Sequence, residues 1–346
     1  MDKILGKKDL PRWLKNLSSS DVYAPQRRDD VWSYELVRDP ETVGLDYSQT
    51  AVPVKSLIFP SREIFLEFRE AEGEGVELVE RRPDGKPAVV FGVRPCEGKA
   101  LILMDKVFGG EFEDLYYQKR RRATTLVGLA CATPPSANCF CVSVNGLPHS
   151  KEGLDVLLTD LGERYYVKAL TKKGEALLAA GGPVLKPASA EDKAAAEKSH
   201  AASEKKFPRQ LRQINEIHLK LKRIFDAPLW DEESRSCIRC GICTFLCPTC
   251  HCFDINDEVD SPAPLAGKRV RTWDTCQFPD FTMHSSGHNP RPDKASRLRQ
   301  RINHKFQYFV EAWNEYQCTG CGRCISLCPV SIDIIQVVEK ARDYVG

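Results

Sequence analysis

One cysteine spacing occurs twice in this chain and constrains its fold more than any other feature. Residues 237–248 read CIRCGICTFLCP and residues 318–329 read CTGCGRCISLCP, so both have the form Cys-x2-Cys-x2-Cys-x3-Cys-Pro. Three sulfur atoms at intervals of three residues allow one loop to surround a compact ligand, whereas the fourth follows a longer interval. The repeat therefore predicts two related ligand-binding loops in the C-terminal part of the chain.

The spacing is the one with which two-cluster bacterial ferredoxins bind [4Fe-4S] clusters, where the fourth Cys of each run ligates the other cluster. We therefore assign one cluster to Cys237, Cys240, Cys243 and Cys328, and the other to Cys318, Cys321, Cys324 and Cys247. Two zinc sites are the alternative, but zinc ligands more usually form two Cys pairs separated by a longer segment.

Glycine and proline in the repeats predict the local backbone. Gly241, Gly320 and Gly322 permit a tight path around the ligand because glycine adopts positive φ without steric cost. The fourth Cys of each run is expected to open a short helix, with Pro248 or Pro329 at the first helical position.

Four further cysteines lie upstream, near predicted strand ends. Cys96 follows a predicted strand at 88–93, Cys131 follows one at 124–130, and Cys139 and Cys141 form a Cys-x-Cys pair. If the two strands are neighbours, all four thiols meet at one edge of the sheet. Their spacing alone leaves two interpretations open, a third Fe–S cluster or scattered buried cysteines.

The segment between the two repeats holds Cys250, Cys252 and Cys276, whose role stays open between buried thiols and a further metal site. His251 is expected to be a loop residue rather than a ligand. Residues 268–305 carry nine Lys or Arg against three acidic residues. These cations either form a solvated face, or offset the charge of anionic clusters or dock a partner subunit.

Alternating strand-like and helix-like patterns from about residue 52 to 180 predict an α/β domain. Strands are expected at 88–93 and 124–130, a hairpin at 155–170 turned at Gly162, and helices at 61–73 and from 172 to Gly181. The whole chain is predicted as an α+β multidomain protein. Its parts are an N-terminal α/β domain at 1–185, a helical linker at 186–226, and a mainly α-helical dicluster ferredoxin-type domain with a long insertion at 227–346.

Composition limits the class of protein. The 346 residues, 42% hydrophobic, suffice for a core without disulfides, and an odd number of cysteines, 15, fits full pairing poorly. A net charge of +2 argues against nucleic-acid binding as the general function. Five of the first ten residues are charged, so a signal peptide is not expected. No uncharged apolar run approaches the roughly 18 residues of a membrane span, so direct membrane insertion is not expected either. We expect a cytoplasmic protein.

Seven blocks in a fixed order carry a resemblance to a known family: FGVRPCEGKAL, NCFCVS, CIRCGICTFLCPTCHCFD, RTWDTCQFPDF, GHNPRP, RLRQRINHKFQYF and CTGCGRCISLCPVSID. Over roughly residues 50–340 the chain resembles the iron–sulfur (A) subunit of anaerobic sulfite reductase and the β subunit of cytosolic NiFe sulfhydrogenases. All of these blocks are intact here. Related subunits also accompany heterodisulfide-reductase-like complexes, so the resemblance does not select the terminal enzyme.

The resemblance implies an electron-transfer subunit of an anaerobic oxidoreductase complex. In such complexes an FAD- and NAD(P)-binding flavoprotein subunit oxidises NAD(P)H, and the iron–sulfur subunit relays electrons to or from a catalytic reductase or hydrogenase subunit. The resemblance also favours a third cluster, whose implied ligands are Cys96, Cys131, Cys139 and Cys141. Two alternatives remain: a subunit that itself reduces a small sulfur or disulfide compound at an N-terminal metal site, and a zinc-stabilised interaction module.

Overall fold

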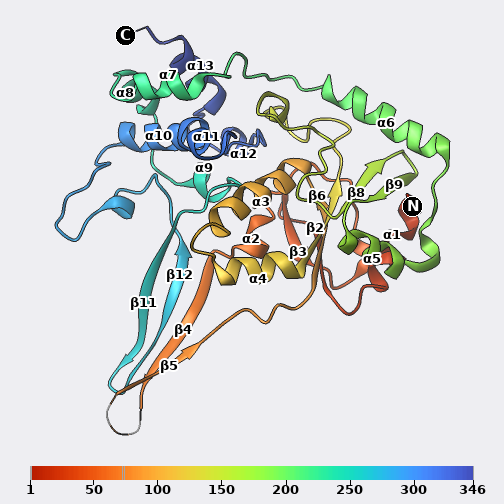
Figure 1. The fold of residues 1–346 in the computed structure, drawn as a ribbon, viewed down its shortest axis with the longest axis horizontal. Helices are drawn as coiled ribbons and strands as arrows, with labels where there is room; N and C mark the ends of the chain where they lie inside the picture. Colours follow the sequence, from red (N-terminus) through yellow and green to blue (C-terminus); the bar gives the residue numbers. More distant parts are fainter. Residues whose placement is uncertain (1, 72, 74, 346) are drawn as a thin grey trace.

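A computed structural model describes residues 2–71, 73 and 75–345, and it contains two β-sheets (Figure 1). The larger sheet has the strand order β10-β1-β9-β8-β7-β6-β2-β3. Its strands are β1 (Lys3–Gly6), β2 (Asp21–Arg28), β3 (Val31–Leu36), β6 (Ala88–Val93), β7 (Thr124–Leu129), β8 (Val156–Asp160), β9 (Arg164–Ala169) and β10 (Lys186–Pro187). The central strands β2, β6, β7 and β8 run parallel, and the outer strands pair antiparallel.

The central strands are apolar because both faces of the larger sheet are covered. On β6, Val89 and Phe91 point into one buried core while Val90 and Val93 point into another on the opposite face. The helices of this part are α1 (Leu10–Lys15), α2 (Lys55–Ile58), α3 (Pro95–Phe108), α4 (Leu115–Ala123), α5 (Lys172–Ala180) and α6 (Ala190–Glu204). The strands predicted at 88–93 and 124–130, the hairpin at Gly162 and the helix ending before Gly181 are confirmed.

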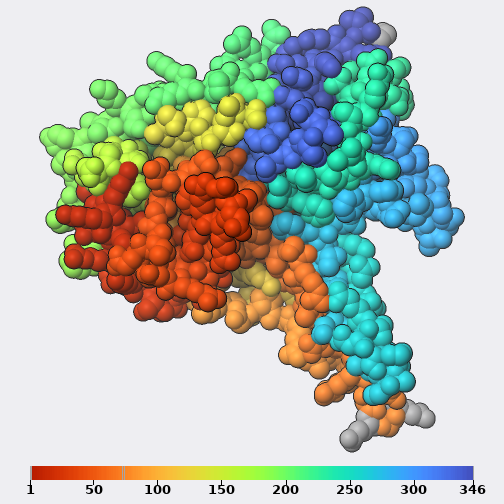
Figure 2. Space-filling view, turned by 180° about the vertical axis from the view of Figure 1, so that it is seen from behind, coloured from red at the N-terminus to blue at the C-terminus, as the bar shows by residue number. Residues whose placement is uncertain are grey.

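The smaller sheet forms an arm that projects from the body of the molecule (Figures 1 and 2). Its order is β11-β12-β4-β5, with β4 (Arg62–Glu70), β5 (Val76–Glu80), β11 (Phe253–Pro262) and β12 (Leu265–Trp273). The helix predicted at 61–73 is therefore wrong over β4, and residue 72 of that prediction lies outside the described residues. β4 is a strand because it pairs on one side with β12, a partner about 200 residues away that no local pattern reveals.

This sheet joins segments that the sequence assigned to different domains. β4 and β5 come from the predicted N-terminal domain, and β11 and β12 come from the predicted C-terminal domain. The description of the C-terminal part as mainly α-helical is not confirmed, because β11 and β12 are strands of ten and nine residues. The boundaries at 185 and 226 remain predictions.

The C-terminal helices surround a separate apolar core. They are α7 (Ile217–Arg223), α8 (Leu229–Ser234), α9 (Ile242–Phe245), α10 (Lys294–Asn303), α11 (Phe309–Trp313), α12 (Arg323–Ser326) and α13 (Ile334–Asp343), with a π-helical turn at His304–Tyr308 between α10 and α11. Short 3₁₀ helices occur at Lys7–Asp9, Pro40–Thr42, Cys141–Ser143, Gly182–Val184 and Asp280–Thr282. Among the described residues, no helix has both the length and the apolar character needed to cross a membrane.

Candidate iron–sulfur centres

The first repeat lines a cavity between α9, α10 and the end of the second repeat. The cavity, here called the first-motif cavity, contains the four thiols assigned to one cluster, Cys237, Cys240, Cys243 and Cys328. Apolar side chains such as Leu298, Ile302 and Val337 form most of the remaining wall. Cys328, which is far along the chain, thus lies with the three thiols of the first repeat, as cross-ligation predicts.

The second repeat lines a neighbouring cavity, the second-motif cavity. Its walls include the four thiols assigned to the other cluster, Cys318, Cys321, Cys324 and Cys247. Arg301, Cys324 and Ile334 line both cavities, so the two cavities are direct neighbours. The hydroxyl of Thr319 lies in the wall of the second-motif cavity, buried and without a hydrogen-bond partner among the described residues.

These observations test whether the cavities suit an Fe–S cluster. The first-motif cavity is lined by its predicted quartet and by Cys324, and the second-motif cavity is lined by its own quartet. The other lining residues include apolar side chains but no carboxylate, and thiols in such surroundings are the donor set that iron–sulfur clusters use. In the part of the chain that the structure describes, no three His, Cys, Asp or Glu side chains are close enough together to hold a single metal ion. The thiols surround a space instead, so their arrangement suits a ligand of several atoms.

Local backbone geometry agrees with the glycine prediction and corrects the helix prediction. Gly241, Gly320 and Gly322 have φ of 76°, 65° and 76°. The short helices α9 and α12 precede the fourth Cys of each repeat rather than follow it, and neither Pro248 nor Pro329 begins a helix. The prediction failed because the third Cys already lies within the short helix, so the chain must leave that helix before the fourth thiol can reach the other cavity.

The upstream thiols line a third cavity, the N-terminal cavity, whose walls contain Cys96, Cys131, Cys139 and Cys141. β6 and β7 are parallel neighbours, so Cys96 and Cys131 follow adjacent strand ends, as the sequence required. Gly320 and Cys321 line this cavity as well as the second-motif cavity. The three cavities therefore form a row, with the second-motif cavity in the middle.

The joint between the second-motif and N-terminal cavities depends on Gly320. The amide of Phe140 donates to the carbonyl oxygen of Gly320 at 2.8 Å, and the Cys139 thiol points to the carbonyl oxygen of Cys321 at 3.7 Å. A Cβ at position 320 would lie 2.5 Å from the amide nitrogen of Cys141. Only glycine therefore permits this close approach of the two cysteine loops.

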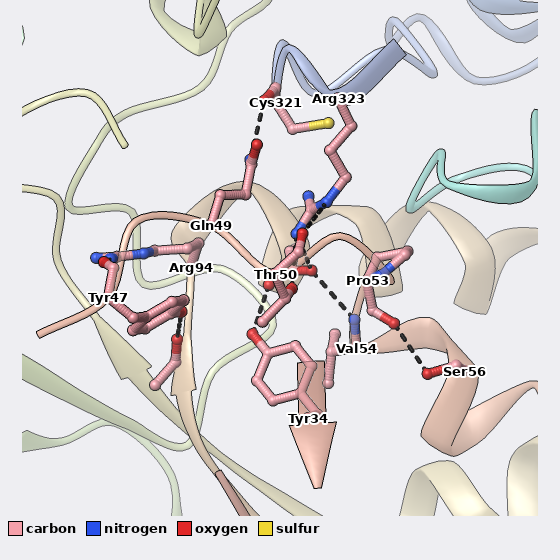
Figure 3. A network of polar contacts seen from close by, with 12 residues as sticks. Tyr34, Tyr47, Gln49, Thr50, Pro53, Val54, Ser56, Arg94, Cys321 and Arg323 are labelled. Carbon is pink, nitrogen blue, oxygen red and sulfur yellow. Dashed lines mark hydrogen bonds and ion pairs between the residues drawn. The ribbon is translucent and has the colours of Figure 1, made fainter. Parts of the chain in front are cut away.

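A buried polar network holds the same joint together from the other side (Figure 3). Arg323, on α12, donates to the backbone and hydroxyl oxygens of Thr50 and pairs with Glu97 at 2.9 Å. The side chains of Arg323 and Glu97 are 1% and 0% exposed. Gln49 adds a bond from its amide to the carbonyl oxygen of Cys321 at 2.9 Å. The N-terminal part thus binds the second repeat through residues that the sequence analysis did not single out.

Part of the basic segment is buried rather than solvated. Arg301 lines both the first-motif and second-motif cavities, and Lys305 lines the second-motif cavity. Burial acts to lower the pKa of Arg301, but attraction from the sulfur atoms of Cys243 and Cys324 outweighs it and raises that pKa well above its ordinary value. The interpretation of the basic segment as a solvated face is therefore wrong for Arg301 and Lys305.

Burial makes the thiols poor acids on their own. It raises the pKa of Cys318 and of Cys139 to about 12. A thiol with such a pKa is neutral at pH 7, whereas iron binds the thiolate, so binding must release protons. Backbone amides already point at two sulfur atoms: Gly320 donates to Cys318 at 3.4 Å and Ile332 donates to Cys328 at 3.2 Å.

Cys250, Cys252 and Cys276 do not line any of the three cavities described here. Arg301 donates to the sulfur of Cys250 at 3.7 Å, and Gln277 donates to the sulfur of Cys276 at 3.4 Å. His251 also lies outside the three cavities, and its ring contacts the carbonyl oxygen of Thr249 at 3.2 Å.

Comparison with known proteins agrees with the motifs. Residues 236–332 match a family model described as "4Fe-4S dicluster domain". The chain is also similar to "Sulfhydrogenase 2 subunit beta" of Pyrococcus furiosus, with 29% identity over 323 residues, which is 93% of this chain and 92% of that protein. The resemblance to iron–sulfur subunits of the sulfhydrogenase β type is confirmed, and a 4Fe-4S dicluster domain is present at the C-terminal side of the chain.

Proposed function

We propose that this relative of sulfhydrogenase β subunits is an electron-transfer subunit that passes single electrons along a row of three [4Fe-4S] clusters. The observation that carries the proposal is the row of cavities, each containing one predicted cysteine quartet and sharing a wall residue with the next. When bound, the clusters would supply one-electron chemistry. The protein would hold them in fixed positions and exclude water between them.

The ligand sets proposed are those assigned from the sequence. The cluster of the first-motif cavity would be held by Cys237, Cys240, Cys243 and Cys328. That of the second-motif cavity would be held by Cys318, Cys321, Cys324 and Cys247. That of the N-terminal cavity would be held by Cys96, Cys131, Cys139 and Cys141. The dicluster model supports the first two, and the geometry of the N-terminal cavity supports the third.

The partners proposed are the other subunits of an oxidoreductase complex. The similar protein is named as one subunit of a sulfhydrogenase, which supports a catalytic hydrogenase subunit as one neighbour. An FAD- and NAD(P)-binding flavoprotein subunit is proposed at the other end of the row. Purification of the native complex without oxygen, followed by mass spectrometry of the copurifying chains, tests both partners.

Metal content gives the first prediction. Anaerobically prepared protein is expected to contain about twelve iron atoms per chain and as much acid-labile sulfide, or about eight if only the two C-terminal sites are filled. Dithionite should reduce the clusters and produce EPR signals. The isolated chain should not turn over a sulfur compound with an artificial electron donor. Zinc without sulfide would contradict the proposal, and turnover would favour the alternative of a reductase site.

Oxygen sensitivity gives a second prediction. Cys240, in the first-motif cavity, is exposed, whereas Cys321 in the middle cavity and Cys131, Cys139 and Cys141 in the N-terminal cavity are buried. Solvent exposure makes a cluster more accessible to oxidants. Brief exposure to air should therefore abolish the EPR signal of the first-motif cluster before the other signals. A time course by EPR and iron analysis, with a sample kept under argon as the control, measures the order of loss.

A further inference from the structure

Two buried cations at the middle of the row have no acidic partner among the described residues. The guanidinium of Arg301 donates to the sulfur of Cys250 at 3.7 Å. The ammonium of Lys305 donates to the hydroxyl of Thr249 at 2.8 Å and to the amide oxygen of Gln317 at 3.1 Å. Neither side chain pairs with a carboxylate within the part of the chain that the structure describes. Arg301 is 5% exposed and Lys305 is 1% exposed.

A buried charge without a counter-ion is costly, so it calls for a negative partner in the place that it faces. Both cations face the second-motif cavity, and Arg301 also faces the first-motif cavity. An Fe–S cluster with four thiolate ligands is anionic and becomes more so when it accepts an electron. The two cations thus face the groups whose charge they would stabilise most in the reduced state.

The contact between the second-motif and N-terminal cavities differs in charge from the surroundings of Arg301 and Lys305. Arg323 follows the Gly320–Cys321 segment that lines both the second-motif and N-terminal cavities, but Glu97 neutralises it. On the N-terminal side, Arg94 donates to the carbonyl oxygen of Ser48 at 3.1 Å and stacks over Tyr47. Within residues 2–71, 73 and 75–345, one carboxylate thus opposes Arg94 and Arg323 near the N-terminal cavity, whereas none opposes Arg301 and Lys305 at the second-motif cavity. In the first-motif cavity, the other lining cation, Arg239, is exposed and therefore screened by water.

We propose that Arg301 and Lys305 make the middle cluster the first of the three to accept an electron, and that Arg301 raises the reduction potentials of both C-terminal clusters together. This inference rests on the proposed electron-transfer function. Cluster potentials respond to nearby charge and burial, so a buried cation at this position favours the reduced form. An electron would then stay on the middle cluster between its arrival from one neighbouring cluster and its departure to the other.

The test is an EPR-monitored redox titration of the full chain, prepared without oxygen. Cys328→Ser and Cys318→Ser first assign the signals of the two C-terminal clusters. In the wild type, the second-motif cluster should have the highest midpoint potential. Arg301→Gln should move two midpoint potentials to more negative values, those of both C-terminal clusters. Lys305→Gln should move only the potential of the second-motif cluster.

Two further variants distinguish charge from packing. Arg301→Lys keeps the charge and should restore both potentials toward the wild-type values. Arg299→Gln makes the same chemical change on the same helix, at a residue that lines neither cavity and pairs with Asp226, and should leave all potentials unchanged. If Arg301→Gln does not assemble clusters, Lys305→Gln and Arg301→Lys still decide the matter.

Several results would overturn the inference while leaving the electron-transfer function intact. These are a wild type in which another cluster is reduced first, an Arg301→Gln variant whose potentials all stay in place or all move alike, and a Lys305→Gln variant whose second-motif potential does not move. By contrast, a wild-type chain without any cluster signal would contradict the proposed function itself.

Discussion

Cys328→Ser is expected to remove the cluster of the first repeat, although Cys328 belongs to the second. Its thiol lies in the first-motif cavity with Cys237, Cys240 and Cys243. The variant should lose about four iron atoms per chain and the EPR signal that Cys237→Ser also removes. Cys247→Ser should instead remove the signal that Cys318→Ser removes. Iron analysis and EPR of the four anaerobic variants measure these losses.

Cys276→Ser serves as the control for this set, because Cys276 lies outside the three cavities. It should keep the signals of all three proposed sites. If Cys328→Ser and Cys318→Ser removed the same signal while Cys237→Ser removed another, each repeat would bind its own cluster, and the crossed ligand sets would be wrong.

Glu97→Ala is expected to lower the free energy of unfolding by about 3–5 kcal/mol, because it leaves Arg323 as a buried charge without a partner. The same carboxylate accepts hydrogen bonds from the hydroxyl of Tyr34 at 2.6 Å and from the amide of Val54 at 3.1 Å. Both donors would lose their acceptor in the variant. Urea unfolding followed by tryptophan fluorescence, under anaerobic conditions, measures the change.

The control for Glu97→Ala is an ion pair at the surface. Lys340 pairs with Glu233 at 2.6 Å, and its side chain is 58% exposed. Lys340→Ala should therefore cost less than about 1 kcal/mol. Equal losses in the two variants would mean that the Arg323–Glu97 pair does not hold the N-terminal part against the second repeat.

The sequence predicted which cysteines lie together better than it predicted what surrounds them. Cysteine spacing is a local property, and the structure brings each predicted quartet to one cavity. The central strand at 88–93 could also be predicted from the sequence, because a strand buried on both faces is a continuous apolar run.

Apart from the short helices of the two repeats, the errors have a common physical cause, which is contact between segments that are distant in the sequence. β4 was predicted as a helix because its charged and apolar residues fit a helical period, and only β12 makes it a strand. The sequence also offered a role for the basic segment beside anionic clusters, but it did not show that Arg301 and Lys305 are the buried members, since a basic segment usually faces water. The ion pair of Glu97 could not be predicted, because nothing in the sequence around Glu97 shows that Arg323 lies opposite it.

The pairing of β4 with β12 has a consequence for how the protein is made. A ribosome adds about 5–20 residues per second, so β4 would wait roughly 10–40 s for β12 to emerge, with only the hairpin partner β5 beside it. Likewise, the thiols of the first-motif cavity are complete only after Cys328 has been translated. Assembly of the proposed cluster in that cavity would therefore be a late event, because its four ligands exist together only when almost the whole polypeptide has been made.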